Sequence, residues 1–137
     1  MSQSTQNFLQ LLGRICLALI FIVAGIRKAL AFTATVAYMA KFGVPFTEPL
    51  AVAAIALEIL GGLALLLGWK TRSVAAMLAI FVVIITPIFH AFWTHEAATF
   101  GNQLNHFLKN VALIGGLLYV FVGGAGAYGL DGSDRRR

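Results

Sequence analysis

The sequence predicts an all-α integral membrane protein, a bundle of four transmembrane helices with both termini on the cytoplasmic side. The first observation behind this prediction is composition. Hydrophobic residues make up 60% of the 137 residues and charged residues only 11%, whereas a soluble domain is about half apolar and a quarter charged. A water-soluble fold of this length would leave much apolar surface uncovered, so the surplus is expected to face lipid. The length predicts a single domain, residues 1–137.

Four long apolar segments are the second observation. A membrane-spanning helix needs about 20 residues, each rising about 1.5 Å along the axis. The candidate spans cover approximately residues 8–32, 49–69, 73–93 and 107–126. Pro87 is expected to kink the third span, because proline removes a backbone hydrogen bond from a helix interior.

The connections between the spans differ in length. Residues 69–72 form a tight turn, which makes the second and third spans antiparallel neighbours. Residues 38–46, within the connection 34–48, predict a short interfacial helix ended by Gly43 and Pro45. Residues 95–106 are polar and are predicted to form a solvated loop.

Orientation, the third observation, follows from lysine and arginine outside the spans. An even number of spans places both termini on the side of the 69–72 turn. That side holds five basic residues and the opposite side one, when four basic residues that lie in or near the spans are set aside. These four are Arg14, Arg27, Lys28 and Lys109. The positive-inside rule then places both termini in the cytoplasm.

The same charge pattern argues against nucleic acid as a partner. Apart from a cluster at 135–137, the basic residues stand singly or in pairs at helix ends, not in a stripe. No metal site is expected either. His95 and His106 flank the polar loop at a spacing that matches no common zinc pattern. Haem would need two histidines that project inward from facing helices, and only His90 lies in or near a span. Cys16 is the only cysteine, which excludes a CxxC redox pair.

Small residues within the spans predict close contacts between helices. The glycine pairs at 61–62 and 115–116 each lie inside a span, where the missing side chains let two backbones approach. Such faces would also permit a homo-oligomer.

Polar residues inside the spans are the candidates for function, because charges in a bilayer are costly and tend to face the bundle interior in pairs. Glu58 lies about nine residues, roughly 13 Å, from the outer end of its span. All four spans are expected to send polar groups into the outer half of the membrane: Lys28, Glu58, His90, and Lys109 with Asn110. Arg14 lies in the inner half, from which it could also reach Glu58.

These residues support two interpretations, which the sequence leaves open. In the first, they form a buried ion-pair network that holds the four helices in register. In the second, they line a pocket in which Lys28 or Lys109 holds an anionic or carbonyl group and Glu58 or His90 transfers protons. A quinone suits such a pocket, since it is flat and apolar with two carbonyl oxygens that accept hydrogen bonds. Whether any reaction is catalysed is not decided by the sequence.

Several segments together resemble the DoxX family. Arg14 and the run Leu-Ala-Leu-Ile-Phe-Ile-Val-Ala-Gly-Ile-Arg-Lys at 17–28 look like the family's opening pattern. Phe-Gly-Val-Pro at 42–45 and Glu-Ile-Leu-Gly-Gly at 58–62 resemble its first loop and second helix. Phe89-His90 and Lys109-Asn110 are similar to its third and fourth helices. The resemblance extends over about residues 8–131 and rests on the order and spacing of these pieces.

The resemblance implies a small multi-pass protein of the bacterial inner membrane. Relatives are linked to redox processes, among them the small membrane subunit of an archaeal thiosulfate:quinone oxidoreductase. It therefore implies an accessory or quinone-binding subunit with a redox enzyme as partner. The family supplies no established catalytic residues, so Arg14, Lys28, Glu58, His90, Lys109 and Asn110 are only positions that match its polar pattern. The alternatives are an assembly partner without chemistry and a transporter of a small lipophile.

Overall fold

The computed structural model describes residues 1–133, which form helices joined by turns, without strands. Four helices are long and apolar enough to cross a membrane, which confirms the predicted all-α bundle of four transmembrane helices, while the orientation of the termini stays a prediction. They are α1 (Gln3–Leu30), α3 (Thr47–Leu67), α4 (Thr71–Phe89) and α5 (Ala97–Gly123). The shorter elements are α2 (Phe32–Lys41), the 3₁₀-helix η1 (Phe92–Thr94) and α6 (Leu130–Ser133).

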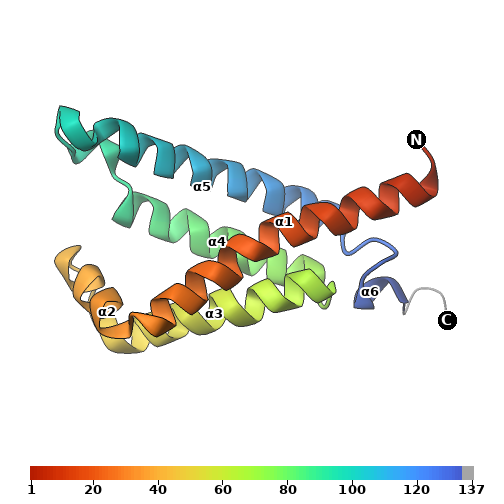
Figure 1. The fold of residues 1–137 in the computed structure, drawn as a ribbon, viewed down its shortest axis with the longest axis horizontal. Coiled ribbons are helices and arrows are strands. Elements are labelled where there is room, and N and C mark those ends of the chain that lie inside the picture. The colour runs from red at the N-terminus through yellow and green to blue at the C-terminus, as the bar shows by residue number, and fades with distance from the viewer. Residues whose placement is uncertain (134–137) are drawn as a thin grey trace.

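The four long helices are arranged as two pairs (Figure 1). α1 packs along α3, and α4 packs along α5. The pairs meet near α6 and the N-terminus, here named the terminal end, and diverge towards α2 and η1, here named the loop end (Figure 1). The first turns of α1 project beyond the bundle at the terminal end (Figure 1).

Glycine allows α1 and α3 to approach closely. A Cβ on Gly25 would stand 3.1 Å from the Cβ of Glu58, and a Cβ on Gly62 would stand 3.2 Å from the carbonyl oxygen of Ala18. The contact predicted for the 61–62 pair is thus confirmed. Of the pair 115–116, only Gly116 is in contact, with Leu17 of α1, while the position of a Cβ on Gly115 is open.

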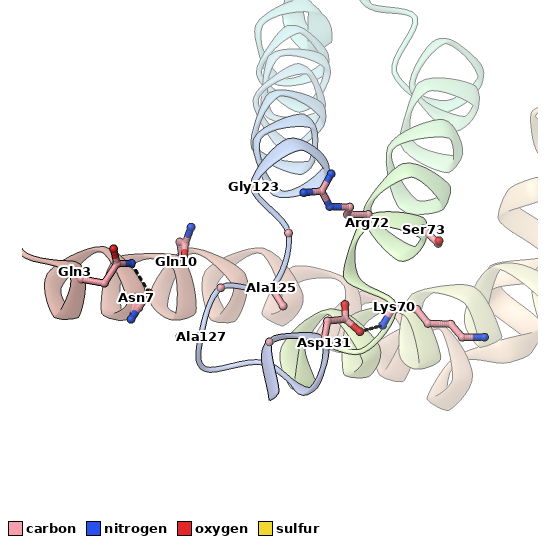
Figure 2. Close-up of a pocket in the computed structure, with 13 residues that line it drawn as sticks. Gln3, Asn7, Gln10, Lys70, Arg72, Ser73, Gly123, Ala125, Ala127 and Asp131 are labelled. Atoms are coloured by element: carbon pink, nitrogen blue, oxygen red, sulfur yellow. Dashed lines mark hydrogen bonds between the residues drawn. The ribbon is translucent and has the colours of Figure 1, made fainter. Parts of the chain in front are cut away.

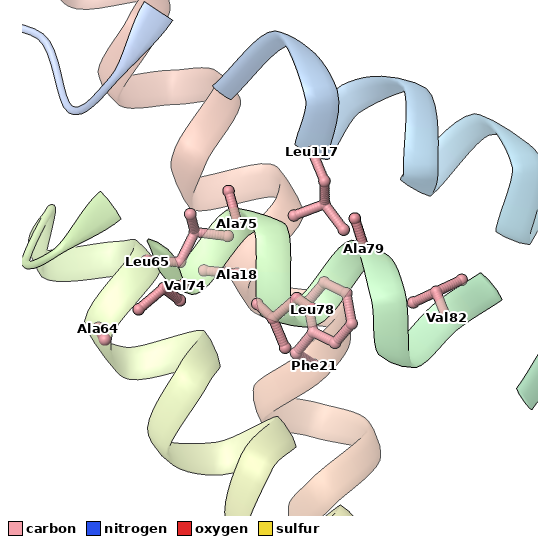
Figure 3. Close-up of a cluster of buried hydrophobic side chains, with 10 residues drawn as sticks. All are labelled: Ala18, Phe21, Ala64, Leu65, Val74, Ala75, Leu78, Ala79, Val82 and Leu117. Carbon is pink, nitrogen blue, oxygen red and sulfur yellow. The ribbon is translucent and has the colours of Figure 1, made fainter. Parts of the chain in front are cut away.

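The apolar core lies in the half of the bundle nearer the terminal end. α4 supplies its centre through Val74, Ala75, Leu78, Ala79 and Val82. Side chains of the other three long helices close around it (Figure 3). They are Ala18 and Phe21 of α1, Ala64 and Leu65 of α3, and Leu117 of α5. Lipid tails are as apolar as these side chains, so close packing and not exclusion of water holds the helices together here.

Several helix boundaries differ from the predicted segments. The loop predicted at 95–106 is wrong, because α5 begins at Ala97 and continues without interruption to Gly123. Hydropathy identifies the apolar part of a helix that crosses the membrane and does not detect a polar extension of the same helix. The hydrogen bonds of a helix are made by the backbone, and many polar residues have good helix propensity. α4 ends at Phe89, two residues after Pro87, and η1 follows. The short helix expected at 38–46 is present as α2 but begins at Phe32.

Candidate functional site

An ion pair joins the two helices of the first pair. The Lys28 ammonium of α1 donates to both carboxylate oxygens of Glu58 in α3, at 2.7 Å each. The Glu58 side chain is 4% exposed and that of Lys28 is 36% exposed. Glu58 is buried where Gly25 lets α1 press against α3, so its charge is compensated by Lys28 while Lys28 keeps an open side.

That open side faces a cavity of about 410 Å³ between α3 and α4 at the loop end. Its walls are mainly aliphatic and aromatic: Leu50, Ala53, Ala54 and Leu57 from α3, and Phe81, Ile84, Ile85, Ile88 and Phe89 from α4. Thr35, Tyr38 and Met39 of α2, with Val44, close one side. Lys28 and His90 are the two titratable nitrogen groups in this lining.

Helix α2 is held over the cavity by aromatic contacts. The Tyr38 ring stacks on Phe89 of α4 with ring centroids 5.6 Å apart, and Phe42 meets Phe89 edge-on at 5.3 Å. The Thr35 hydroxyl donates to the Lys28 carbonyl at 3.3 Å, which ties α2 to the end of α1. Partial burial raises the pKa of the Tyr38 hydroxyl, so Tyr38 remains a neutral hydrogen-bond donor beside the cavity.

His90, which follows α4, contacts two residues of α5. Its Nδ1 lies 3.0 Å from Oε1 of Gln103, and its ring stacks on His106 with centroids 5.0 Å apart. An amide oxygen only accepts hydrogen bonds, so Nδ1 is the donor in this geometry and the neutral ring keeps Nε2 as an acceptor. Gln103 and His106 lie within residues 95–106, for which the sequence predicts a solvated loop and the structure has helix α5. A period-3.6 pattern through 103–110 would have been the signal for them.

Lys109 and Asn110 do not reach the cavity. The Asn110 amide donates to the Thr86 hydroxyl at 3.0 Å. Asn110 and Thr86 are both buried between α4 and α5. Lys109, the preceding residue on α5, is exposed. Polar residues of the four spans therefore do not converge on one pocket as expected.

Arg14 lies at the opposite end, far along the bundle from Glu58. Its guanidinium is buried and donates to the carbonyls of Leu65 and Leu66 at 3.0 Å and of Tyr128 at 2.8 Å. The alternative in which Arg14 reaches Glu58 is wrong, because Arg14 instead satisfies carbonyls that the last turn of α3 leaves free. It thereby joins α3 to the C-terminal segment.

Asp131 caps α4 in the same region. Its two carboxylate oxygens accept from the backbone N–H groups of Lys70 and Thr71 at 2.8 and 2.7 Å. Burial alone would raise the pKa of Asp131, but these hydrogen bonds and the nearby Arg14 charge hold it below its ordinary value. Asp134 and the arginines at 135–137 lie outside the described residues.

Within residues 1–133 no group of three His, Cys, Asp or Glu side chains is close enough to hold a metal ion. The structure thus brings Lys28 and His90 to one cavity, with Glu58 behind Lys28, and places Asn110 in a helix interface. Arg14 lies at the terminal end, and Lys109 is exposed on α5. The cavity residues that sequence reasoning missed, Thr35 and Tyr38, come from the interfacial helix α2.

Comparison with known proteins places this architecture in a family. The DoxX family model matches residues 9–91. The chain belongs to the DoxX family. It is 33% identical over 123 residues to the inner membrane protein YphA of Escherichia coli, covering 90% of this chain and 88% of that protein. It is 37% identical over 124 residues to the inner membrane protein YqjF of the same organism, with 88% of each covered. No solved structure matches the chain.

The family and the four apolar helices together identify the chain as a multi-pass inner-membrane protein. The matched residues extend from within α1 to the end of α4, and they include the Lys28–Glu58 pair and the whole cavity lining.

Proposed function

We propose that this DoxX-family protein is an accessory membrane subunit that binds a quinone or a similar carbonyl-bearing lipophile for a redox system. The observation that carries the proposal is the apolar cavity between α3 and α4, with Lys28 and His90 in its wall. Its volume of about 410 Å³ falls in the range of small-molecule pockets, roughly 300–1,000 Å³, which are mostly apolar with a few polar groups that fix orientation.

The charge of the site favours a neutral ligand over an anion. An ammonium has three N–H donors, and two of those of Lys28 go to Glu58. The third is free to donate to a ligand oxygen. Because the adjacent carboxylate neutralises the ammonium, a carboxylate or phosphate ligand would gain little attraction and would meet the Glu58 charge. A carbonyl oxygen accepts the third hydrogen bond without that repulsion.

His90 supplies the complementary group. With Nδ1 bound to Gln103, Nε2 is free to accept a proton from a ligand hydroxyl, as in the reduced form of a quinone. The site therefore offers one donor, Lys28, and one acceptor, His90. Glu58 acts through Lys28 as a positioning residue. The redox setting is proposed from family membership, because relatives in the DoxX family are linked to redox processes.

An assembly role without chemistry is the second candidate. The Lys28–Glu58 and Asn110–Thr86 contacts each join two neighbouring helices, as expected of groups whose only task is to fix helix register. On this reading, substitutions in either contact lower stability and leave no separate effect on a bound ligand.

Native mass spectrometry with quinone extraction separates the two candidates. Gently purified wild-type protein is expected to carry one quinone per chain, and protein stripped of it should take up an added short-chain ubiquinone. Lys28→Met should lose the quinone, and Ala54→Leu, which fills the cavity wall, should exclude it. Asn110→Ala is the matched control, because its polar contact lies outside the cavity, and it should retain the quinone. A bundle that stays empty in every preparation and co-purifies with a second protein would overturn the proposal in favour of assembly.

A further inference from the structure

A second cavity of about 690 Å³, lined by amide, charged and small residues, opens at the terminal end, remote from the proposed quinone site. It lies between the first turns of α1, the start of α4 and the segment that follows α5 (Figure 2). The proposed function leaves this cavity without a role.

One wall of the cavity is a row of amides. Gln3, Asn7 and Gln10 of α1 line it, and their spacing places them on one face of the helix. Phe8 and Leu12, on other faces of the same turns, are 57% and 44% exposed. The projecting start of α1 is thus polar in its first turn and carries exposed apolar side chains from Phe8 onward, as expected of a segment that passes through a membrane–water boundary.

Arg72 is the cation available to a ligand in this cavity. Both oxygens of Asp131 are taken by backbone N–H groups, and the Lys70 ammonium lies over the Trp69 ring, 5.1 Å from its centroid. The Arg72 side chain extends towards Gly123 (Figure 2), and its Nε would stand 3.4 Å from a Cβ on Gly124. Among residues 1–133 it has no hydrogen-bond or salt-bridge acceptor.

The surroundings of the cavity fit an interfacial depth in the bilayer. Trp69, half exposed in the adjoining turn, is the type of residue that gathers where acyl chains meet headgroups. Val122, at the end of α5 beside the cavity, is 70% exposed. A molecule in the cavity therefore has polar walls around one end and exposed apolar side chains beside it.

We propose that this cavity binds the headgroup of an anionic phospholipid, with the Arg72 guanidinium on the phosphate and the amides of α1 on headgroup hydroxyls. Guanidinium matches the geometry of phosphate oxygens with paired hydrogen bonds. Basic pockets between membrane helices are suited to such headgroups. A glycerol headgroup offers hydroxyls to Asn7 and Gln10, whereas choline offers no hydrogen-bonding group and brings a positive charge towards Arg72. Phosphatidylglycerol is therefore favoured over phosphatidylcholine.

The test is lipid titration of delipidated protein in detergent, followed by native mass spectrometry. Wild type is expected to retain one phosphatidylglycerol in preference to phosphatidylcholine. Arg72→Gln should weaken phosphatidylglycerol binding about tenfold, the loss of one charge-assisted contact. Lys41→Gln, which removes the same charge from the exposed end of α2, is the matched control and should bind like wild type. Asn7→Ala with Gln10→Ala should reduce the preference for phosphatidylglycerol over phosphatidic acid while phosphate binding persists.

Three outcomes would overturn the proposal. Equal losses in Arg72→Gln and Lys41→Gln would mean that lipid responds to net charge alone. Equal retention of the two lipids by wild type would mean that the cavity does not select a headgroup. Binding of inorganic phosphate or glycerol 3-phosphate as tight as that of the lipid would assign the site to a soluble phosphate compound. The thermal midpoint of Arg72→Gln in detergent should match that of wild type, since the side chain is exposed.

Discussion

Lys28 of α1 and Glu58 of α3 form a two-oxygen ion pair, with the ammonium 2.7 Å from each carboxylate oxygen. Glu58 is almost fully buried, whereas Lys28 is about one-third exposed. The two side chains therefore differ in whether they can reach a polar environment when the partner is removed. Lys28 can turn towards the cavity if its partner is lost, whereas Glu58 cannot reach solvent.

We therefore expect Lys28→Met to destabilise the protein more than Glu58→Gln. Breaking a fully buried pair costs about 3–5 kcal/mol, and the exposure of Lys28 reduces this to about 1–3 kcal/mol here. Denaturant titration in detergent micelles measures the free energy of unfolding. The double variant should be more stable than the sum of the two single losses predicts. Glu48→Gln, at an exposed carboxylate of the same helix, serves as the control. Strict additivity of the two changes would contradict a coupled pair.

Gly62→Ala is expected to separate α1 from α3. The new Cβ would stand 3.2 Å from the Ala18 carbonyl oxygen, a backbone atom that cannot rotate away, and overpacking of this kind typically costs about 1–3 kcal/mol. Gly115→Ala is the matched control, because its Cβ meets nothing within 4 Å and alanine favours the helix. Thermal unfolding should therefore show a lower midpoint for the first variant and an equal or higher one for the second. The same midpoint for both would mean that the helices do not approach at Gly62.

Asp131→Ala is expected to lower stability by about 1 kcal/mol near neutral pH, as loss of a helix cap does. The pKa of Asp131 is lower in the folded protein than its ordinary value near 3.9. Its stabilising contribution is thus present above that ordinary pKa and is lost as pH falls through the folded-state pKa. The gap in thermal midpoint between wild type and variant should close in acid. Glu96→Ala is the control, since Glu96 precedes α5 without a side-chain capping hydrogen bond. A gap that persists below both pKa values would exclude the carboxylate as its source.

Arg14→Lys should loosen the C-terminal segment. A lysine cannot span the three carbonyls that Arg14 binds, those of Leu65, Leu66 and Tyr128, because its ammonium is a point donor where guanidinium is a planar fork. Hydrogen exchange of peptides covering residues 124–133 should quicken, while exchange in the middle of α4 stays slow. Unchanged protection of residues 124–133 would mean that Asp131 alone holds this segment.

Asn110→Ala should lower stability by about 0.6–1.7 kcal/mol, the measured scale for hydrogen bonds between membrane helices. The amide contacts Thr86 in the α4–α5 interface and lies outside the cavity lining, so quinone content should not change. Thr86→Val tests the same contact from the other side, and the pair of changes should be less than additive. A quinone loss in Asn110→Ala at wild-type stability would place Asn110 in the ligand site.

The sequence by itself determined the four spanning helices and the polar residues worth following. Composition and the length of each apolar run settle these, because a bilayer accepts only helices long enough to cross it. It also predicted a close helix contact at the 61–62 glycines, since small residues are what such contacts need, but not which helices meet there.

Tertiary structure alone decided which polar groups meet. Lys28, Lys109 and Arg14 are equally charged in the sequence, but only Lys28 reaches Glu58, because α1 packs on α3 whereas Lys109 lies on an exposed face of α5. The cavity depends on the divergence of two helix pairs and on α2 crossing between them. The cap from Asp131 joins residues sixty positions apart. Helix rotation and pairing fix all of these, and hydropathy encodes neither, because within each span apolar side chains occur both in the core and on the exposed surface.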